Sequence, residues 1–199
     1  MDPSSKSFAE IARKLLDQNR VAADQMQTRL VQAQDPDYWR SLNPQLHIEG
    51  SLRPDFEPLP ASDADISKCL DSVRRFGYFK LPPVIAPHVL QEMVAAVETL
   101  AAEDWPATFA MVYDEFWQIS RTSTAKRLLE SILGPGFKQN SNTWTHHVRP
   151  ARGSSGWHPH IDGLQDSTDR LSLWIPLTDA TLDNGCMYVI PRDRMPAAL

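Results

Sequence analysis

The chain has 199 residues, of which 42 % are hydrophobic and 23 % charged, and its 20 basic and 25 acidic side chains give a formal charge of −5. This length and composition are typical of a globular protein with a sizeable core. The acidic balance argues against nucleic acid or an anionic membrane as the main partner. No apolar run approaches the roughly 20 residues that span a bilayer. We expect a cytoplasmic chain, because the N-terminus lacks the pattern of a secretory signal and Cys69 and Cys186 have no spacing partner.

The N-terminal region is predicted to be a helix followed by a proline-rich linker. Apolar residues recur at three- and four-residue spacing over residues 7–34, which predicts one helix with a thin apolar stripe. The sequence at 35–39 ends this helix, and four prolines within 44–60 predict an extended linker. We therefore divide the chain into residues 1–61 and 62–199. The thin stripe leaves association into a homo-oligomer open.

Three further helices are predicted from their ends and their periodicity, over residues 62–76, from Pro87 to just before Trp105, and over about 123–133. A serine N-cap and a following glycine bound the first of them. Residues 78–81, directly after it, have the composition of a short strand. Four aromatic residues between the second and third helices are interpreted as core: Phe109, Tyr113, Phe116 and Trp117.

After Gly136 the pattern changes to that of β-strands. Residues 143–148 are mostly strand-forming, and residues 171–178 alternate between apolar side chains and others. The Asp-Asn-Gly sequence at 183–185 favours a hairpin turn before a further strand. This half of the chain is therefore predicted to form a β-sheet core.

His160 and Asp162 are the first candidates for chemistry. Side chains at positions i and i+2 of a strand point to the same face, so this pair can offer one nitrogen and one oxygen to the same ion. Such a pair suits a 2-His-1-carboxylate iron centre, which leaves open positions for a cosubstrate and oxygen. The alternative is a structural hydrogen-bonded pair, with Asp162 and Gly163 making a turn.

The residues that follow strengthen the iron hypothesis. His160-Ile161-Asp162, the strand Trp174-Ile175-Pro176-Leu177-Thr178-Asp179, Asn184-Gly185 and Val189-Ile190-Pro191 together resemble the phytanoyl-CoA dioxygenase family. The resemblance covers roughly residue 62 to the end and is strongest from Trp144 onward. It implies an α+β fold with a double-stranded β-helix (jelly-roll or cupin-like) core, incomplete at the C-terminus, and an N-terminal helical region.

The resemblance also implies an activity and a site. The activity is that of a non-haem Fe(II)- and 2-oxoglutarate-dependent dioxygenase, which uses molecular oxygen to hydroxylate a small organic substrate. His160 and Asp162 would be the catalytic iron ligands, and Thr145 and Trp174 would line the 2-oxoglutarate pocket. The family takes a further His ligand and an Arg for 2-oxoglutarate from later strands, and the tail of this sequence has no match for them. If Leu199 ends the protein, we expect weak iron binding and little or no turnover.

Two other functions stay open. A chain without the third ligand would be a non-catalytic β-helix binding module or pseudoenzyme. The triplet of His158, His160 and Asp162 also resembles the metal site of metallo-β-lactamase-type hydrolases, although Gly163 stands where those sites have another His. Of the other histidines, His146 and His147 are expected to be structural, with the alternative that one of them reaches the site, and His47 is interpreted as a surface residue of the linker.

Overall fold

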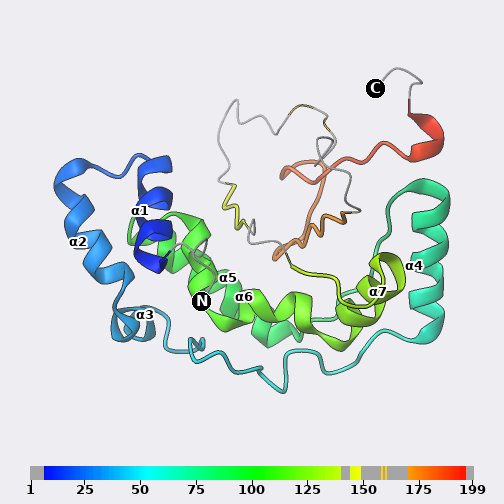
Figure 1. Ribbon diagram of the computed structural model, residues 1–199, viewed down its shortest axis with the longest axis horizontal. Coiled ribbons are helices and arrows are strands. Elements are labelled where there is room, and N and C mark those ends of the chain that lie inside the picture. Colours follow the sequence, from blue (N-terminus) through cyan, green and yellow to red (C-terminus); the bar gives the residue numbers. More distant parts are fainter. Residues whose placement is uncertain (1–6, 140–143, 149–157, 159, 161–169, 196–199) are drawn as a thin grey trace. The chain divides into compact units, whose positions relative to one another are not determined.

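The computed structural model describes residues 7–139, 144–148, 158, 160 and 170–195 (Figure 1). The chain divides into two compact units: unit 1 is Met1–Arg53, His88–Gln118 and Ser141–His147, and unit 2 is Pro54–Pro87, Ile119–Asn140 and Val148–Leu199. The boundary predicted between residues 61 and 62 stays a prediction. The α-helices of the described residues are α1 (Phe8–Gln18), α2 (Ala23–Ala33), α3 (Pro36–Leu42), α4 (Asp63–Phe76), α5 (Pro87–Ala102), α6 (Asp114–Gln118) and α7 (Ser123–Leu133). The 3₁₀ helices are η1 (Ala107–Val112), η2 (Ile119–Arg121) and η3 (Arg192–Arg194).

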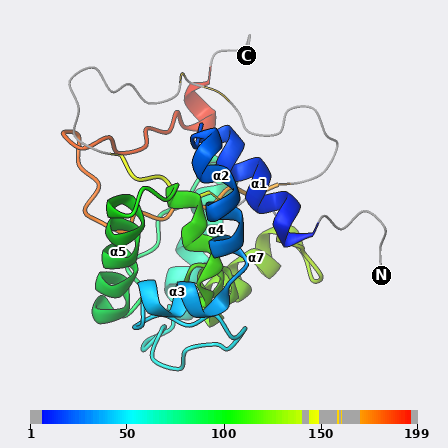
Figure 2. The same cartoon turned by 90° about the vertical axis from the view of Figure 1, so that its left-hand side faces the viewer.

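Unit 1 begins with two helices where one was predicted. A capping box starts α1: the Ser7 hydroxyl accepts from the Glu10 amide, and the Glu10 carboxylate accepts from the Ser7 amide at 2.7 Å. The prediction of one helix over residues 7–34 is wrong, because the chain turns between α1 and α2, where Arg20 has a φ of +58°. The two helices lie side by side (Figure 2), and they bury Leu16 and Leu30.

An aromatic cluster forms the core of unit 1. Trp39 of α3 packs against Trp105, with ring centroids 4.7 Å apart, and Trp105 lies at the same distance from Phe109. The indole N–H of Trp39 donates to the Ala33 carbonyl at 2.9 Å. Residues 35–39, predicted only to end the first helix, begin a further helix that was not predicted, because Asp35 caps α3 and the helix brings Trp39 into the core.

Tyr113 joins this cluster through its hydroxyl group. The hydroxyl donates to the Trp39 carbonyl at 3.0 Å and accepts from Asn43 Nδ2 at 2.8 Å. Burial raises the pKa of Tyr113 to about 12. The predicted core role is confirmed for three of the four aromatic residues, since Phe109, Tyr113 and Phe116 are buried.

Unit 2 is built on α4 and α7, which pack against each other (Figure 1). Their predicted bounds are confirmed. Ser62 caps α4 by accepting from the Asp65 amide, and Gly77 ends it with a φ of +81°. Ile66, Cys69 and Leu128 are buried between the helices. Burial raises the pKa of the Cys69 thiol, which keeps it in the unreactive protonated form.

The residues after α4 meet η3 near the helix end. An ideal Cβ placed on Gly77 would lie 3.4 Å from Arg192 Nε and 3.5 Å from Arg192 Cβ. The left-handed backbone at Gly77 therefore favours glycine, whereas a Cβ there would be in ordinary van der Waals contact with Arg192.

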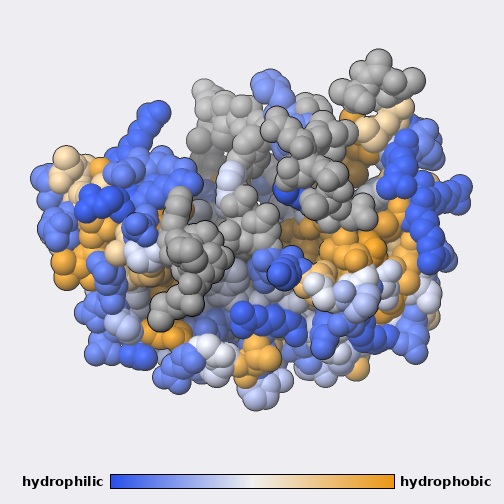
Figure 3. Space-filling model, viewed as in Figure 1, coloured by the Kyte–Doolittle hydropathy of each residue, from blue (hydrophilic) through white to orange (hydrophobic). Residues whose placement is uncertain are grey.

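The predicted double-stranded β-helix is wrong for the residues that the structure describes, because none of them lies in a β-strand. Most side chains of the predicted strands are exposed, among them Trp174 at 48 % and Tyr188 at 75 %. Hydrophobic residues, in orange, also lie on the face drawn in Figure 3. Residues 78–81 are also irregular. Apolar alternation indicates a half-buried face, but a strand also needs a neighbour for its backbone N–H and C=O groups. Within the described residues, no segment pairs with the backbone of the predicted strands in this way.

Candidate functional site

His160 makes a hydrogen bond to the backbone of a nearby residue. Its Nδ1 lies 2.7 Å from the carbonyl oxygen of His158. Because a carbonyl oxygen only accepts, Nδ1 is the donor of this bond. Metal-bound histidines commonly donate their other ring N–H to such a carbonyl. Its proposed partner, Asp162, lies outside the described residues.

The two residues predicted for the cosubstrate lie in different units. Thr145 belongs to unit 1, is half-buried, and donates from Oγ1 to the Met111 sulfur of η1 at 3.7 Å. Trp174 belongs to unit 2, as His160 does, and about half of its side chain is exposed. The structure thus gives Thr145 a neighbour, Met111, that the sequence did not indicate.

A complete metal site is not found among the described residues, where no three His, Cys, Asp or Glu side chains come together as ligands. Of the two predicted iron ligands, the structure describes His160, whose Nδ1 is bonded to the His158 carbonyl. His146 and His147 are exposed, and the ring of His146 packs edge-on against Trp144 with centroids 5.7 Å apart. Partial removal from water lowers the pKa of His146.

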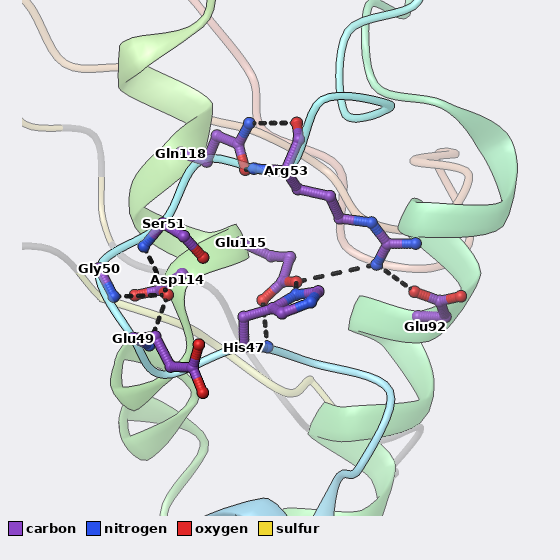
Figure 4. A network of polar contacts seen from close by, with 9 residues as sticks. All are labelled: His47, Glu49, Gly50, Ser51, Arg53, Glu92, Asp114, Glu115 and Gln118. Carbon is purple, nitrogen blue, oxygen red and sulfur yellow. Dashed lines mark hydrogen bonds and ion pairs between the residues drawn. The ribbon is translucent and has the colours of Figure 1, made fainter.

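A second polar site, which the sequence did not predict, surrounds Glu115 in unit 1 (Figure 4). The carboxylate is fully buried, and its Oε1 accepts from His47 Nδ1 at 2.7 Å. Its Oε2 accepts from the His47 backbone N–H at 3.2 Å, and Arg53 Nη1 lies 3.7 Å from Oε1. Arg53 also pairs with Glu92 of α5. His47 was interpreted as a surface residue, but its half-exposed ring is tied to a buried charge.

Two neighbours of Glu115 extend this contact along residues 47–53, which we call the strap. Asp114 Oδ2 accepts from three successive backbone amides, those of Glu49, Gly50 and Ser51, at 2.8, 2.8 and 3.2 Å. Gln118 pairs both its amide atoms with the backbone of Arg53, at 2.8 and 2.7 Å. One sequence signal could have found this site: acidic residues 114 and 115 stand among aromatic core residues, where a buried charge requires partners.

Comparison with known families identifies the chain. The model of the phytanoyl-CoA dioxygenase (PhyH) family matches residues 73–195, more than half of the chain. The chain therefore belongs to the phytanoyl-CoA dioxygenase family, as its motifs predicted. No curated protein and no solved structure matches it. The matched region contains His160, Trp174, Thr145 and Glu115, whereas the strap precedes it.

Membership defines the class of chemistry. The family consists in general of oxygenases that use Fe(II) and 2-oxoglutarate with oxygen and a small-molecule substrate. The match therefore favours the oxygenase hypothesis over the metallo-hydrolase hypothesis. No helix in the part of the chain that the structure describes is both long and apolar enough to cross a membrane.

Proposed function

We propose that this chain supplies the site of an Fe(II)- and 2-oxoglutarate-dependent oxygenase that hydroxylates a small organic molecule. The observation that carries the proposal is the family match across residues 73–195, which includes the His160-x-Asp162 pair. The hydrogen bond of the His160 ring supports it, because metal-bound histidines commonly donate one ring N–H to a backbone carbonyl.

In this proposal His160 and Asp162 are iron ligands, and Thr145 and Trp174 line the pocket for 2-oxoglutarate. Bound iron supplies the oxidising chemistry, in which conversion of 2-oxoglutarate to succinate and carbon dioxide accompanies hydroxylation of the substrate. The protein would bind the iron, orient 2-oxoglutarate and the substrate, and exclude water from the pocket. The hydrogen bond from Nδ1 to the His158 carbonyl orients the His160 ring.

Thr145 has a neighbour that places its side chain. Its hydroxyl donates to the thioether sulfur of Met111 at 3.7 Å. In the proposed function the Thr145 side chain, placed in this way, forms one wall of the 2-oxoglutarate pocket. Trp174, half of which faces water, would lose exposed apolar area when a cosubstrate lies against it.

The test is an anaerobic Fe(II) titration of the purified chain with 2-oxoglutarate present, followed by the visible absorption of the iron–oxoglutarate chelate. We expect a band that disappears in His160→Ala and in Asp162→Ala. The control is Asp183→Ala, which removes an exposed carboxylate of the same type and should keep the band. Alanine variants of His146, His147 and His158 test whether one of them is a further ligand.

A folded chain that gives no band at saturating iron and 2-oxoglutarate would overturn the proposal. Far-ultraviolet circular dichroism of each variant separates loss of ligands from loss of fold. A band that survives both His160→Ala and Asp162→Ala would show that the iron binds elsewhere.

A further inference from the structure

We propose that the strap, residues 47–53, positions Thr145 and thereby sets the affinity for 2-oxoglutarate, with Glu115 as the connecting residue. This inference rests on the proposed function. The strap lies before the region that the family model matches, so the family's motifs do not include it. Every contact in the argument lies within unit 1.

The first step is that polar contacts fix the strap to α6. Three side chains of α6, those of Asp114, Glu115 and Gln118, bond to it, and the Asp114 amide donates back to the His47 carbonyl at 2.8 Å. Most strap residues are exposed, and Leu52 is among the exposed apolar side chains. Apolar burial therefore contributes little here, and the register between strap and helix depends on these polar bonds.

The second step is that a buried charge makes this register strict. Glu115 has no access to water, so its carboxylate depends on His47 and Arg53 for donors and for positive charge. A shift of the strap along α6 would separate Glu115 from these partners. The strap and the helix therefore move together.

The third step connects α6 to Thr145. The indole N–H of Trp117, in α6, donates to the backbone carbonyl of Met111, in η1. The Met111 sulfur in turn accepts from the Thr145 hydroxyl at 3.7 Å. Met111 of η1 therefore contacts both Trp117 and Thr145, the residue that the proposed function places in the wall of the 2-oxoglutarate pocket. The contacts thus form a continuous path from His47 to Thr145.

The experiment combines two measurements on Glu115→Gln and on His47→Ala, which changes a half-exposed residue and is therefore the better tolerated of the two. Hydrogen–deuterium exchange followed by mass spectrometry reports the backbone around residues 144–148. Titration of the anaerobic Fe(II) protein with 2-oxoglutarate reports its affinity. The matched control is Asp37→Asn, which breaks an exposed pair with Arg40 on α3.

We expect faster exchange at 144–148 in both variants, and a 2-oxoglutarate midpoint that rises about two- to thirtyfold. The control should change neither quantity. Because the strap positions Thr145 and takes no part in the reaction, the turnover number at saturating 2-oxoglutarate should stay close to that of the wild type. His47→Gln restores a side-chain donor for Glu115 and should recover most of the affinity.

Unchanged exchange at 144–148 in folded Glu115→Gln and His47→Ala would overturn the inference, and so would faster exchange with an unchanged 2-oxoglutarate midpoint. If the wild type itself forms no iron–oxoglutarate chelate, it is the proposed function that fails. Exchange then still decides whether the strap positions Thr145.

Discussion

Glu115 and His47 lie 68 positions apart in the sequence, yet the imidazole Nδ1 of one is 2.7 Å from the carboxylate of the other. The carboxylate is fully buried, whereas 48 % of the His47 side chain is exposed. The pair therefore joins a surface segment to the interior of unit 1. Since a buried carboxylate without partners is costly, α6 can pack in this way only while the strap is in place.

Replacing this carboxylate should destabilise the protein. We expect Glu115→Gln to lower the free energy of unfolding by about 2–3 kcal/mol, because His47 and Arg53 lose a charged acceptor while Arg53 keeps Glu92. Urea denaturation monitored by circular dichroism measures the change. Asp37→Asn, at a pair where Asp37 is 88 % exposed, should cost no more than about 1 kcal/mol. Equal effects of the two substitutions would contradict the prediction.

Tyr113 should make stability depend on alkaline pH. Burial raises the pKa of Tyr113 from 10 to about 12, so the folded state keeps a proton that the unfolded chain releases. The stabilisation is complete below pH 10 and falls as the pH rises from 10 to 12, by roughly 3 kcal/mol for two pKa units. Urea denaturation at increasing pH measures this slope.

Tyr113→Phe is the control for that slope. The variant should lose about 1–3 kcal/mol at neutral pH, because Asn43 Nδ2 and the Trp39 carbonyl lose their hydroxyl partner. Its stability should fall less steeply than that of the wild type above pH 10. Parallel curves for the two proteins would show that Tyr113 is not the group that titrates.

Gly77 should tolerate no side chain without a cost. Gly77→Ala places a Cβ on a residue with a φ of +81°, which costs about 1–2 kcal/mol. The same Cβ lies 3.4 Å from Arg192 Nε, an ordinary van der Waals distance, so the cost comes from the backbone conformation. Thermal unfolding of Gly77→Ala, Arg192→Ala and the double variant checks this. Arg192→Ala should not rescue Gly77→Ala, and a full rescue would mean that contact with Arg192, and not backbone strain, causes the loss.

Trp174 should contribute more to cosubstrate binding than to stability. About half of its side chain is already in water, so we expect Trp174→Ala to change the free energy of unfolding by less than about 1 kcal/mol. In the proposed function it weakens 2-oxoglutarate binding, which the chelate titration measures. A loss of several kcal/mol would place Trp174 in a packed core instead.

The helices that sequence analysis predicted correctly are those whose ends are set locally. Ser62 and Gly77 bound α4, and Gly134 follows α7, through contacts within a few residues. The break between α1 and α2 was missed because Arg20, a residue with no preference for positive φ, makes the turn where a glycine would have marked it.

The β-core prediction shows a different limit. The alternation of apolar and other side chains over residues 171–178 is a property of one segment. A β-strand forms only when a second segment offers backbone N–H and C=O groups for hydrogen bonds. A hairpin turn was predicted at Asn184-Gly185, and a turn does form there without flanking strands among the described residues: Asn184 Oδ1 accepts from the Thr181 amide at 2.7 Å, and Gly185 has a φ of +82°. Turn chemistry is local and pairing is not, so the turn could be predicted where the sheet could not.

The candidate sites also include one part that the local sequence could predict and one part that it could not. The His160-x-Asp162 pair together with the segments between Trp174 and Pro191 was sufficient to predict the family. The pairing of His47 with Glu115 could not be predicted, because nothing near His47 indicates a partner so distant in the sequence.

The three amides that converge on Asp114 have one more consequence. Glu49, Gly50 and Ser51 hold their N–H groups around a single carboxylate oxygen, and the φ of +73° at Gly50 helps to curve the backbone into this shape. Asp114→Gly would leave this arrangement of donors with a space the size of a small acid. Added formate should then restore part of the lost thermal stability, whereas chloride at the same ionic strength should restore less. Chemical rescue would thus measure how far the loop is shaped for its anion before the anion arrives.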